Sequence, residues 1–277
     1  MPTPNPNVEQ LLRGAGQFTT PCGNGHLVWR QWGSGDPIVL CHGGSGSWNH
    51  WFKTIPALET RCEVWVPDLP GLGDSAMPAP PLTPASSAAA LVDGIRALIS
   101  PDRRLHLVGF SFGAQIATLA AADLGAQLTD LTLIGTAALG LPMTPMNFPK
   151  ERTSMTEAER RVVYRHILEI LMFADPTRID ELAIDLQAEN MKKARFRSRE
   201  FAATDIVSAG LAHVSAPLRV IWGERDLIAR PSIAACTDIL RRHHPELIAR
   251  TVKGAGHWVM YEEGDAFNAT LIDLLSL

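Results

Sequence analysis

The sequence predicts an α/β protein built on a mostly parallel, doubly wound sheet with a helical insertion. Three observations lead to this fold class. Short apolar runs alternate with longer helical patterns between residues 37 and 135, as expected when crossover helices join parallel strands. Most of these runs are apolar throughout, which is typical of strands buried on both faces. The alternation then stops and resumes only at residue 218.

Residues 1–7 come first and contain neither a basic nor an apolar run, so we interpret them as a flexible tail. Residues 25–32 partly alternate between apolar and polar side chains and predict an edge strand. The other strand candidates are short apolar runs bounded by turn residues: 37–41, 62–67, 105–108, 131–134, 218–222 and 248–252. The core helix candidates lie between or after them: 48–58, 85–99, 112–124, 232–243 and 261–275.

A stretch without strand candidates interrupts this core. It contains several prolines and then amphipathic helical patterns over 156–175 and 177–195. We therefore predict a core formed by residues 8–136 and 212–277, with a helical insertion over 137–211. In open α/β sheets, ligands bind at the carboxyl ends of the strands. Because the insertion leaves the sheet at such an end, we expect it to form a lid over the site.

The composition argues against several classes of function. The formal net charge is −4 and no basic domain is present, which argues against nucleic acid as a partner. No apolar run approaches the roughly 18 residues that a membrane helix needs. With no secretory signal visible, we expect a cytoplasmic protein that acts on a small molecule, and a homodimer is compatible with this. The four cysteines are scattered, so neither a disulfide framework nor a zinc site is expected, and Cys41 and Cys62 should be buried thiols.

The motif Gly109-Phe110-Ser111-Phe112-Gly113 joins a strand candidate directly to a helix candidate. Such a turn forces the residue at its apex into a strained conformation, and small residues on either side let the strand and helix pass closely. The Ser111 hydroxyl would then project beside a helix N-terminus, which favours developing negative charge. This context predicts a nucleophilic serine, the alternative being an ordinary turn between a strand and a helix.

A nucleophilic serine needs a base and an orienting acid, each at the carboxyl end of a strand. Of the nine histidines, only His257 combines a glycine-rich loop, small neighbours and the correct end of the sheet. The loop after the preceding strand candidate supplies two acids, Glu224 and Asp226, and we favour Asp226 because it lies further into the loop. The backbone N–H groups of Gly44 and Phe112 are the candidate oxyanion donors.

Four blocks of the chain together resemble the α/β-hydrolase superfamily: His42-Gly43-Gly44, the loop 68–75, the elbow at 109–113 and Gly256-His257. The resemblance implies an eight-stranded sheet and a Ser111–Asp226–His257 triad that needs no metal or organic cofactor. Gly256-His257-Trp258 is also similar to the Gly-His-Trp of capped hydrolases that cleave carbon–carbon bonds, which implies a substrate-binding role for Trp258. Those enzymes usually carry Ser-Gly-Pro-Gly after the His-Gly, where this chain has Gly44-Ser45-Gly46-Ser47.

The substrate is much less specified than the fold. Apolar residues near the elbow and in the insertion could line an acyl site or simply pack the insertion on the core: Phe110, Phe112, Met143, Met146, Phe148, Met172 and Phe173. The basic run 192–199 predicts either a solvated helix end or an arginine for a substrate carboxylate, with Arg195 and Arg197 as candidates.

Three functions stay open on the sequence. The first is hydrolysis of a carboxylic ester or lactone through an acyl-enzyme. The second is hydrolysis of a carbon–carbon bond in a vinylogous diketone. The third is binding of a ligand without hydrolysis.

Overall fold

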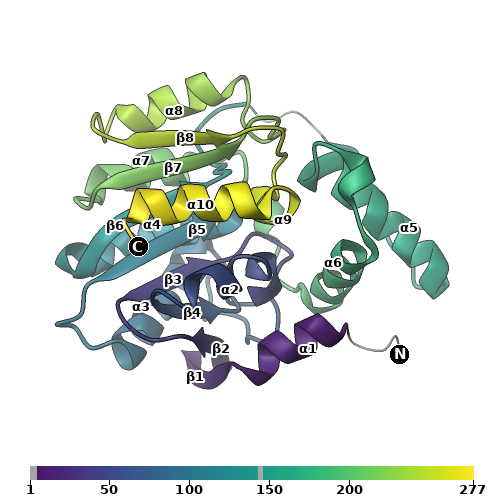
Figure 1. Cartoon of the computed structure of the whole chain (residues 1–277), viewed down its shortest axis with the longest axis horizontal. Coiled ribbons are helices and arrows are strands. Elements are labelled where there is room, and N and C mark those ends of the chain that lie inside the picture. Colours follow the sequence, from purple (N-terminus) through teal and green to yellow (C-terminus); the bar gives the residue numbers. More distant parts are fainter. Residues whose placement is uncertain (1–4, 143–145) are drawn as a thin grey trace.

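The computed structural model describes residues 5–142 and 146–277. Within these residues, eight strands form one sheet in the order β1-β2-β4-β3-β5-β6-β7-β8 (Figure 1). The strands have these bounds: β1 Gly16–Cys22, β2 Gly25–Trp32, β3 Pro37–Cys41, β4 Glu63–Pro67, β5 Leu105–Phe110, β6 Leu128–Ile134, β7 Leu218–Gly223 and β8 Ile248–Val252. The pairs β1–β2 and β2–β4 are antiparallel, and the other neighbours are parallel. The predicted fold class is confirmed.

Strand β1 is absent from the sequence prediction, and it takes the edge position that was predicted for β2. Only Thr20 and Cys22 of β1 are buried, and Pro21 interrupts the pattern. Backbone pairing with β2 along the whole of β1 holds it in the sheet. A strand held by pairing rather than by burial leaves little trace in hydropathy, which explains the omission.

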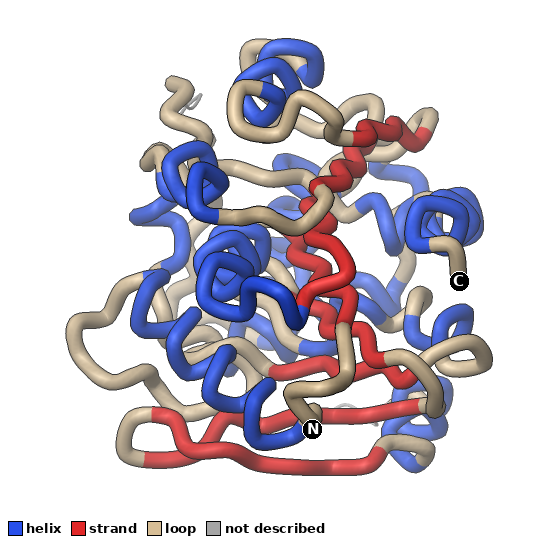
Figure 2. The backbone as a smooth tube through the Cα atoms, turned by 90° about the vertical axis from the view of Figure 1, so that its left-hand side faces the viewer, coloured by secondary structure: helices blue, strands red, loops and turns tan. Residues whose placement is uncertain are grey.

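Helices cover both faces of the sheet (Figure 2). Their bounds are α1 Pro6–Arg13, α2 Ile55–Leu58, α3 Pro84–Leu98, α4 Phe112–Leu124, α5 Glu157–Ile167, α6 Glu181–Lys193, α7 Ile206–Gly210, α8 Ile233–Arg241, α9 Val259–Glu262 and α10 Gly264–Leu275. Successive strand residues point to opposite faces. Val39 and Cys41 therefore join a core with α3, α4, α7 and α8, whereas Ile38 and Leu40 join a core with α2 and α10. All four cysteines are buried and free.

Several predicted elements differ from the structure at their ends. Of the tail predicted for residues 1–7, residues 1–4 lie outside the described residues, and Asn5 caps a helix that starts at Pro6. The helix predicted over 48–58 is a 3₁₀ turn followed by α2, which begins beside Pro56. Proline lacks a backbone N–H but fits the first turn of a helix, so it starts a new helix here rather than continuing an old one.

The chain between β6 and β7 contains α5, α6 and α7. Figure 1 shows α5 and α6 beside each other at one end of the sheet, on the same side as α9. Ile167 of α5 and Ile184 of α6 belong to the same apolar cluster as Trp51 and Trp258 of the core. These helices are therefore packed onto the core rather than separated from it.

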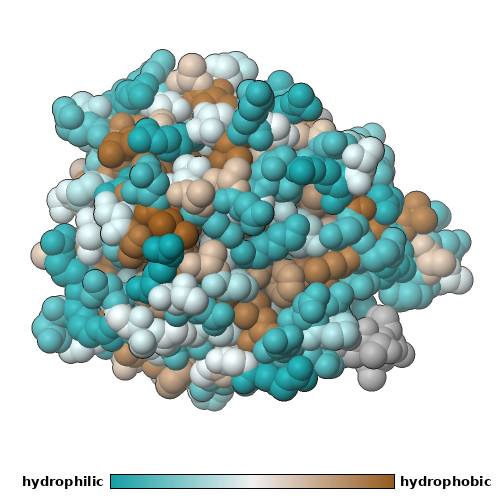
Figure 3. Space-filling model, viewed as in Figure 1, coloured by the Kyte–Doolittle hydropathy of each residue, from teal (hydrophilic) through white to brown (hydrophobic). Residues whose placement is uncertain are grey.

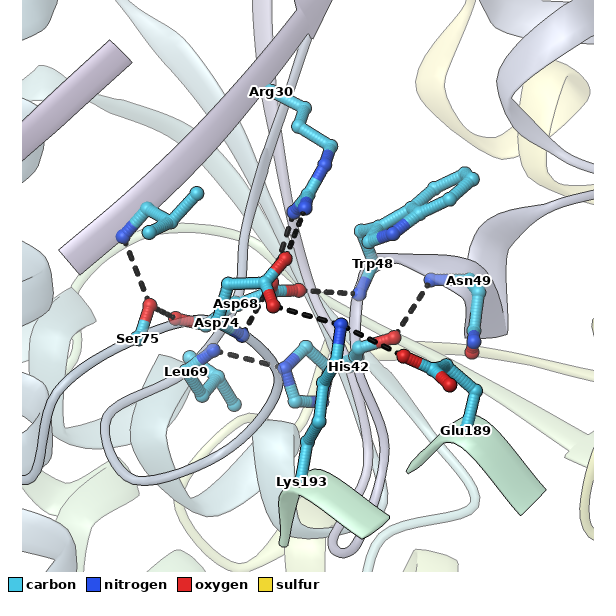
Figure 4. Close-up of polar contacts among 12 residues, drawn as sticks. Arg30, His42, Trp48, Asn49, Asp68, Leu69, Asp74, Ser75, Glu189 and Lys193 are labelled. Atoms are coloured by element: carbon cyan, nitrogen blue, oxygen red, sulfur yellow. Dashed lines mark hydrogen bonds and ion pairs between the residues drawn. The ribbon is translucent and has the colours of Figure 1, made fainter. Parts of the chain in front are cut away.

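An ionic network that is buried at Arg30 and Asp68 and partly exposed at Asp74 and Lys193 joins α6 to the core (Figure 4). Asp68 accepts hydrogen bonds from Arg30 at 2.8 Å, from the Trp48 N–H at 2.8 Å and from the Asp74 N–H at 3.0 Å. Arg30 also pairs with Asp74 at 2.7 Å, and Asp74 in turn pairs with Lys193 of α6 at 2.8 Å. The network runs from the sheet to α6 through charges that neutralise one another.

The molecular surface seen in Figure 3 is largely hydrophilic, with hydrophobic residues in small separate groups. Among the helices of residues 5–142 and 146–277, none combines the length and hydropathy that crossing a lipid bilayer requires.

Replacing Arg30 with Met should strongly destabilise the protein. The Arg30 and Asp68 side chains are only 8% and 1% exposed, so the change leaves a buried carboxylate without its main partner. Loss of one member of such a pair costs about 3–5 kcal/mol. As a matched control, Arg13→Met breaks an exposed pair with Glu9 and should cost less than about 1 kcal/mol. Urea unfolding of both variants measures the difference, and equal losses would contradict the role given to the network.

Candidate active site

Ser111 lies at the junction of β5 and α4. Its φ of 54° is in the left-handed region that non-glycine residues rarely adopt. The flanking glycines allow this turn because a Cβ on Gly109 would lie 2.5 Å from the Gly113 carbonyl oxygen. A Cβ on Gly113 would lie 2.4 Å from the carbonyl oxygens of Cys41 and His42. Because neither position carries a side chain, β5 and α4 pass closely and the serine projects from the turn.

His257 approaches this serine from the loop between β8 and α9. Its Nε2 lies 2.9 Å from the Ser111 Oγ, and its Nδ1 lies 2.9 and 3.0 Å from the two carboxylate oxygens of Asp226. The His257 and Asp226 side chains are 2% and 0% exposed. Behind the pair, a Cβ on Gly135 would lie 2.8 Å from Asp226 Oδ2 and 2.9 Å from His257 Nδ1. The absence of a side chain at residue 135 thus gives the pair its space.

The structure selects between the two acids that follow β7. Asp226 contacts His257, and its Oδ1 also accepts the Ile228 N–H at 2.8 Å. Glu224 instead accepts the Gly254 N–H at 2.9 Å at an exposed position. A carboxylate held by both an imidazole and a backbone N–H is well placed to fix the orientation of the ring.

Gly44 and Phe112 lie next to each other beside Ser111. Phe112 is the first residue of α4, so its N–H has no partner within the helix. A Cβ on Gly44 would lie 3.4 Å from the Phe112 Cβ. In the described part of the chain, neither N–H donates a hydrogen bond. Two free donors beside a serine can stabilise an oxygen that gains negative charge.

A pocket of about 210 Å³ opens over Ser111. Several of the predicted residues line it, together with Ile167: Phe110, Phe112, Met146, Phe148 and Met172. Met143, also a candidate, lies outside the described residues.

Four of the predicted pocket residues do not line the pocket: Phe173, Arg195, Arg197 and Trp258. The Arg195 guanidinium donates to the Ser75 carbonyl and its backbone N–H to the Gly71 carbonyl, so it joins the segment to the core. Trp258 is fully buried behind the pocket, where its indole N–H donates to the His50 carbonyl at 3.0 Å.

Arg199, rather than the expected Arg195 or Arg197, is the arginine of the basic run that lines the pocket. Its guanidinium lies 3.9 Å from the ring centroid of Phe148. The residue as a whole is exposed, yet partial burial of its guanidinium lowers its pKa from the usual value. Among the described residues, no carboxylate lies within ion-pair distance of it. The basic run indicated an arginine for the pocket, but not which of its members would line it.

Glu262 is a functional candidate that the sequence gave no reason to choose. Its buried carboxylate accepts N–H groups from Gly256 at 2.7 Å, Ala174 at 3.0 Å and Asp175 at 2.8 Å. One carboxylate therefore joins the loop that carries His257 to the segment that supplies Met172. No local pattern marks such a glutamate, because its partners are backbone groups from a distant part of the chain.

Comparison with known proteins gives matches over most of the chain. A family model described as the alpha/beta hydrolase family matches residues 38–270. The chain is 27% identical over 264 residues to the dihydrolipoyllysine-residue acetyltransferase component of the acetoin cleaving system of Pseudomonas putida, covering 90% of this chain but 66% of that protein. It is 25% identical over 259 residues to 2-hydroxy-6-oxo-6-phenylhexa-2,4-dienoate hydrolase of Burkholderia cepacia, covering 88% and 89%.

A likeness to a solved structure concerns the fold alone. A serine hydrolase involved in carbazole degradation superposes with a TM-score of 0.74 at 20% identity, covering 95% of this chain and 99% of that one.

Replacing Glu262 with Gln should loosen the loop of His257. The amide cannot accept all the hydrogen bonds that the carboxylate accepts, and hydrogen bonds to charged groups contribute about 1.5–3 kcal/mol each. We expect the free energy of unfolding to fall by about 2–3 kcal/mol, as measured by urea denaturation. The control Glu246→Gln changes an exposed glutamate and should leave stability unchanged. A Glu262→Gln protein as stable as the parent would contradict this account.

Proposed function

The chain belongs to the alpha/beta hydrolase family, and on this premise we propose that it is a serine hydrolase that cleaves a carboxylic ester or lactone through an acyl-enzyme. The observation that supports this most is the continuous hydrogen-bonded series from the Ser111 hydroxyl through His257 to Asp226. A serine becomes nucleophilic when an adjacent base accepts its proton.

In this proposal, His257 acts as the general base. Asp226 accepts a hydrogen bond from Nδ1–H, which leaves Nε2 without a proton and free to take the proton of Ser111 as its oxygen attacks the carbonyl carbon. The buried carboxylate then stabilises the imidazolium that forms. The imidazolium gives its proton to the leaving alcohol, so that an acyl-enzyme and a free alcohol result. Water, deprotonated by His257, then attacks the acyl group; the imidazolium returns this proton to the Ser111 Oγ as the bond to the acyl carbon breaks, and the acid is released.

The N–H groups of Gly44 and Phe112 stabilise the negative oxygen in both steps of this mechanism. Fixed backbone donors need no rearrangement when charge develops, so they lower the barrier more than mobile solvent would. The apolar side chains around Ser111 limit the access of water to this site, which strengthens these electrostatic contacts.

Hydrolysis of a carbon–carbon bond in a dienoate is the second candidate. Two observations favour it: the likeness to a dienoate hydrolase over most of both chains, and the cation of Arg199 in the pocket without a carboxylate among the described residues. An unpaired guanidinium in a partly dehydrated pocket suits a substrate that carries its own carboxylate. Turnover of either substrate class would exclude the third alternative, ligand binding without hydrolysis.

Replacing Ser111 with Ala should lower kcat by a factor of about 10³ or more, because the nucleophile is removed while binding is retained. The substrates are p-nitrophenyl acetate, a set of lactones and a 2-hydroxy-6-oxo-dienoate. The control Ser100→Ala lies at an exposed turn before β5 and should keep the parent rate. An active Ser111→Ala protein would remove the serine from the mechanism, and an inactive parent across the whole set would reject the proposal.

Replacing Arg199 with Gln should raise KM for carboxylated substrates by about tenfold, the effect of losing one charge-assisted hydrogen bond of about 1.5 kcal/mol. KM for neutral esters should stay within about twofold, since they present no charge to the guanidinium. Arg197 is the matched control, because its side chain is 84% exposed and lies outside the pocket. Equal KM changes for charged and neutral substrates would exclude a carboxylate site at Arg199.

A further inference from the structure

The imidazole of His50 is a buried polar group that the proposed mechanism does not use. It lines the same pocket as Ser111 and His257, yet the residue is only 1% exposed. Its ring centroid lies 5.5 Å from that of Phe110 and 5.1 Å from that of Trp258. A Cβ on Gly46 would lie 2.2 Å from the His50 Cε1. Packing on several sides therefore fixes the ring in one orientation.

The hydrogen bonds of His50 define which nitrogen carries its proton. The Gly43 N–H donates to Nδ1 at 3.2 Å, so Nδ1 holds no proton. Burial, followed by the nearby rings of His42 and His257, holds the pKa of His50 well below its usual value. The ring is consequently neutral at neutral pH, and its single proton lies on Nε2.

The Nε2–H group is a donor without an acceptor among the described residues. A buried donor that lacks a partner costs about 1–3 kcal/mol. The side chain that carries this donor lines the pocket, but Nε2 itself is almost completely covered, so a bound molecule supplies the missing acceptor once neighbouring pocket side chains shift on binding. Donors that are satisfied only by the ligand are a common source of specificity, because a ligand without the matching atom leaves them unpaired.

We propose that His50 is a specificity-determining residue whose Nε2–H binds an oxygen of the substrate close to the carbonyl that Ser111 attacks. This inference rests on the proposed function of the pocket. The Gly43 N–H donates to His50 Nδ1, and a Cβ on Gly43 would lie 3.3 Å from the Ser111 Cβ, so one residue separates the imidazole from the serine. The preferred substrates are acyl compounds with a second oxygen acceptor, such as an ether or keto oxygen, rather than plain hydrocarbon acyl groups.

Matched esters test this directly. The p-nitrophenyl esters of methoxyacetate and butanoate have acyl chains of equal length that differ in one oxygen, as do those of 3-methoxypropanoate and pentanoate. After correction for buffer hydrolysis, kcat/KM of the parent should favour the oxygen-containing member of at least one pair. His50→Leu removes the donor and should abolish this preference, a change of about threefold to tenfold, as expected for one hydrogen bond. His50→Gln keeps both an acceptor for Gly43 and a donor for the pocket, and should retain part of it.

A binding measurement separates this proposal from the proposed function. In the Ser111→Ala background, calorimetry gives the Kd of each ester without turnover, and the same His50-dependent preference should appear. A parent that hydrolyses none of the esters rejects the proposed function, while the Kd values still decide the role of His50. If His50→Leu weakens both members of each pair equally in kcat/KM and in Kd, the imidazole is structural and the proposal is overturned. If His50→Leu does not fold, the same measurements on His50→Gln decide the role of the imidazole. Thermal unfolding of this variant and of the parent shows that both are folded.

Discussion

The close passage of β5 and α4 at the elbow is the constraint on which the rest of the site depends. With no Cβ on Gly109 or Gly113, the strand, the helix and the loop after β3 come within contact distance of one another. Ser111 then has to adopt a positive φ, and the free N–H of Phe112 lies beside its hydroxyl. Strain of this kind persists only where the surrounding structure over-determines it. Here the surrounding structure consists of two buried parallel strands and a fully packed helix.

The second requirement is that loops from three different strands meet at one point. β5, β7 and β8 are parallel and end at the same edge of the sheet. Asp226 and His257 can therefore reach Ser111 although both lie more than a hundred residues further along the chain. The segment between β6 and β7 supplies part of the pocket lining. Two kinds of polar contact attach this segment to the core. The carboxylate of Glu262 accepts the backbone N–H groups of Ala174 and Asp175. The buried side-chain amide of Asn190 donates to the Asn49 Oδ1 at 2.8 Å.

Sequence could predict the parts of this arrangement that follow from local pattern. Ser111, His257 and Asp226 each follow a strand whose apolar run is visible in the sequence, so their meeting follows from parallel topology. Arg199 could not be distinguished from Arg195 in the same way. A basic run shows that the segment is hydrated, but which cation faces inward depends on the 3₁₀ turn at Ser198–Phe201 and on how it seats against the core. Strand β1 was missed for a related reason, since pairing rather than burial maintains it.

Gly46 and His50 form a unit whose consequences extend to how this pocket could evolve or be redesigned. The imidazole fills the volume that any larger residue at position 46 would need, so the two positions compete for one space. Substitutions at residues in contact are seldom additive. We expect strong epistasis here: a larger side chain at 46 becomes tolerable only after 50 has become smaller. Among related sequences the two sites should covary. A library that randomises only one of the two positions at a time would consist mostly of variants in which the two side chains clash or leave a cavity.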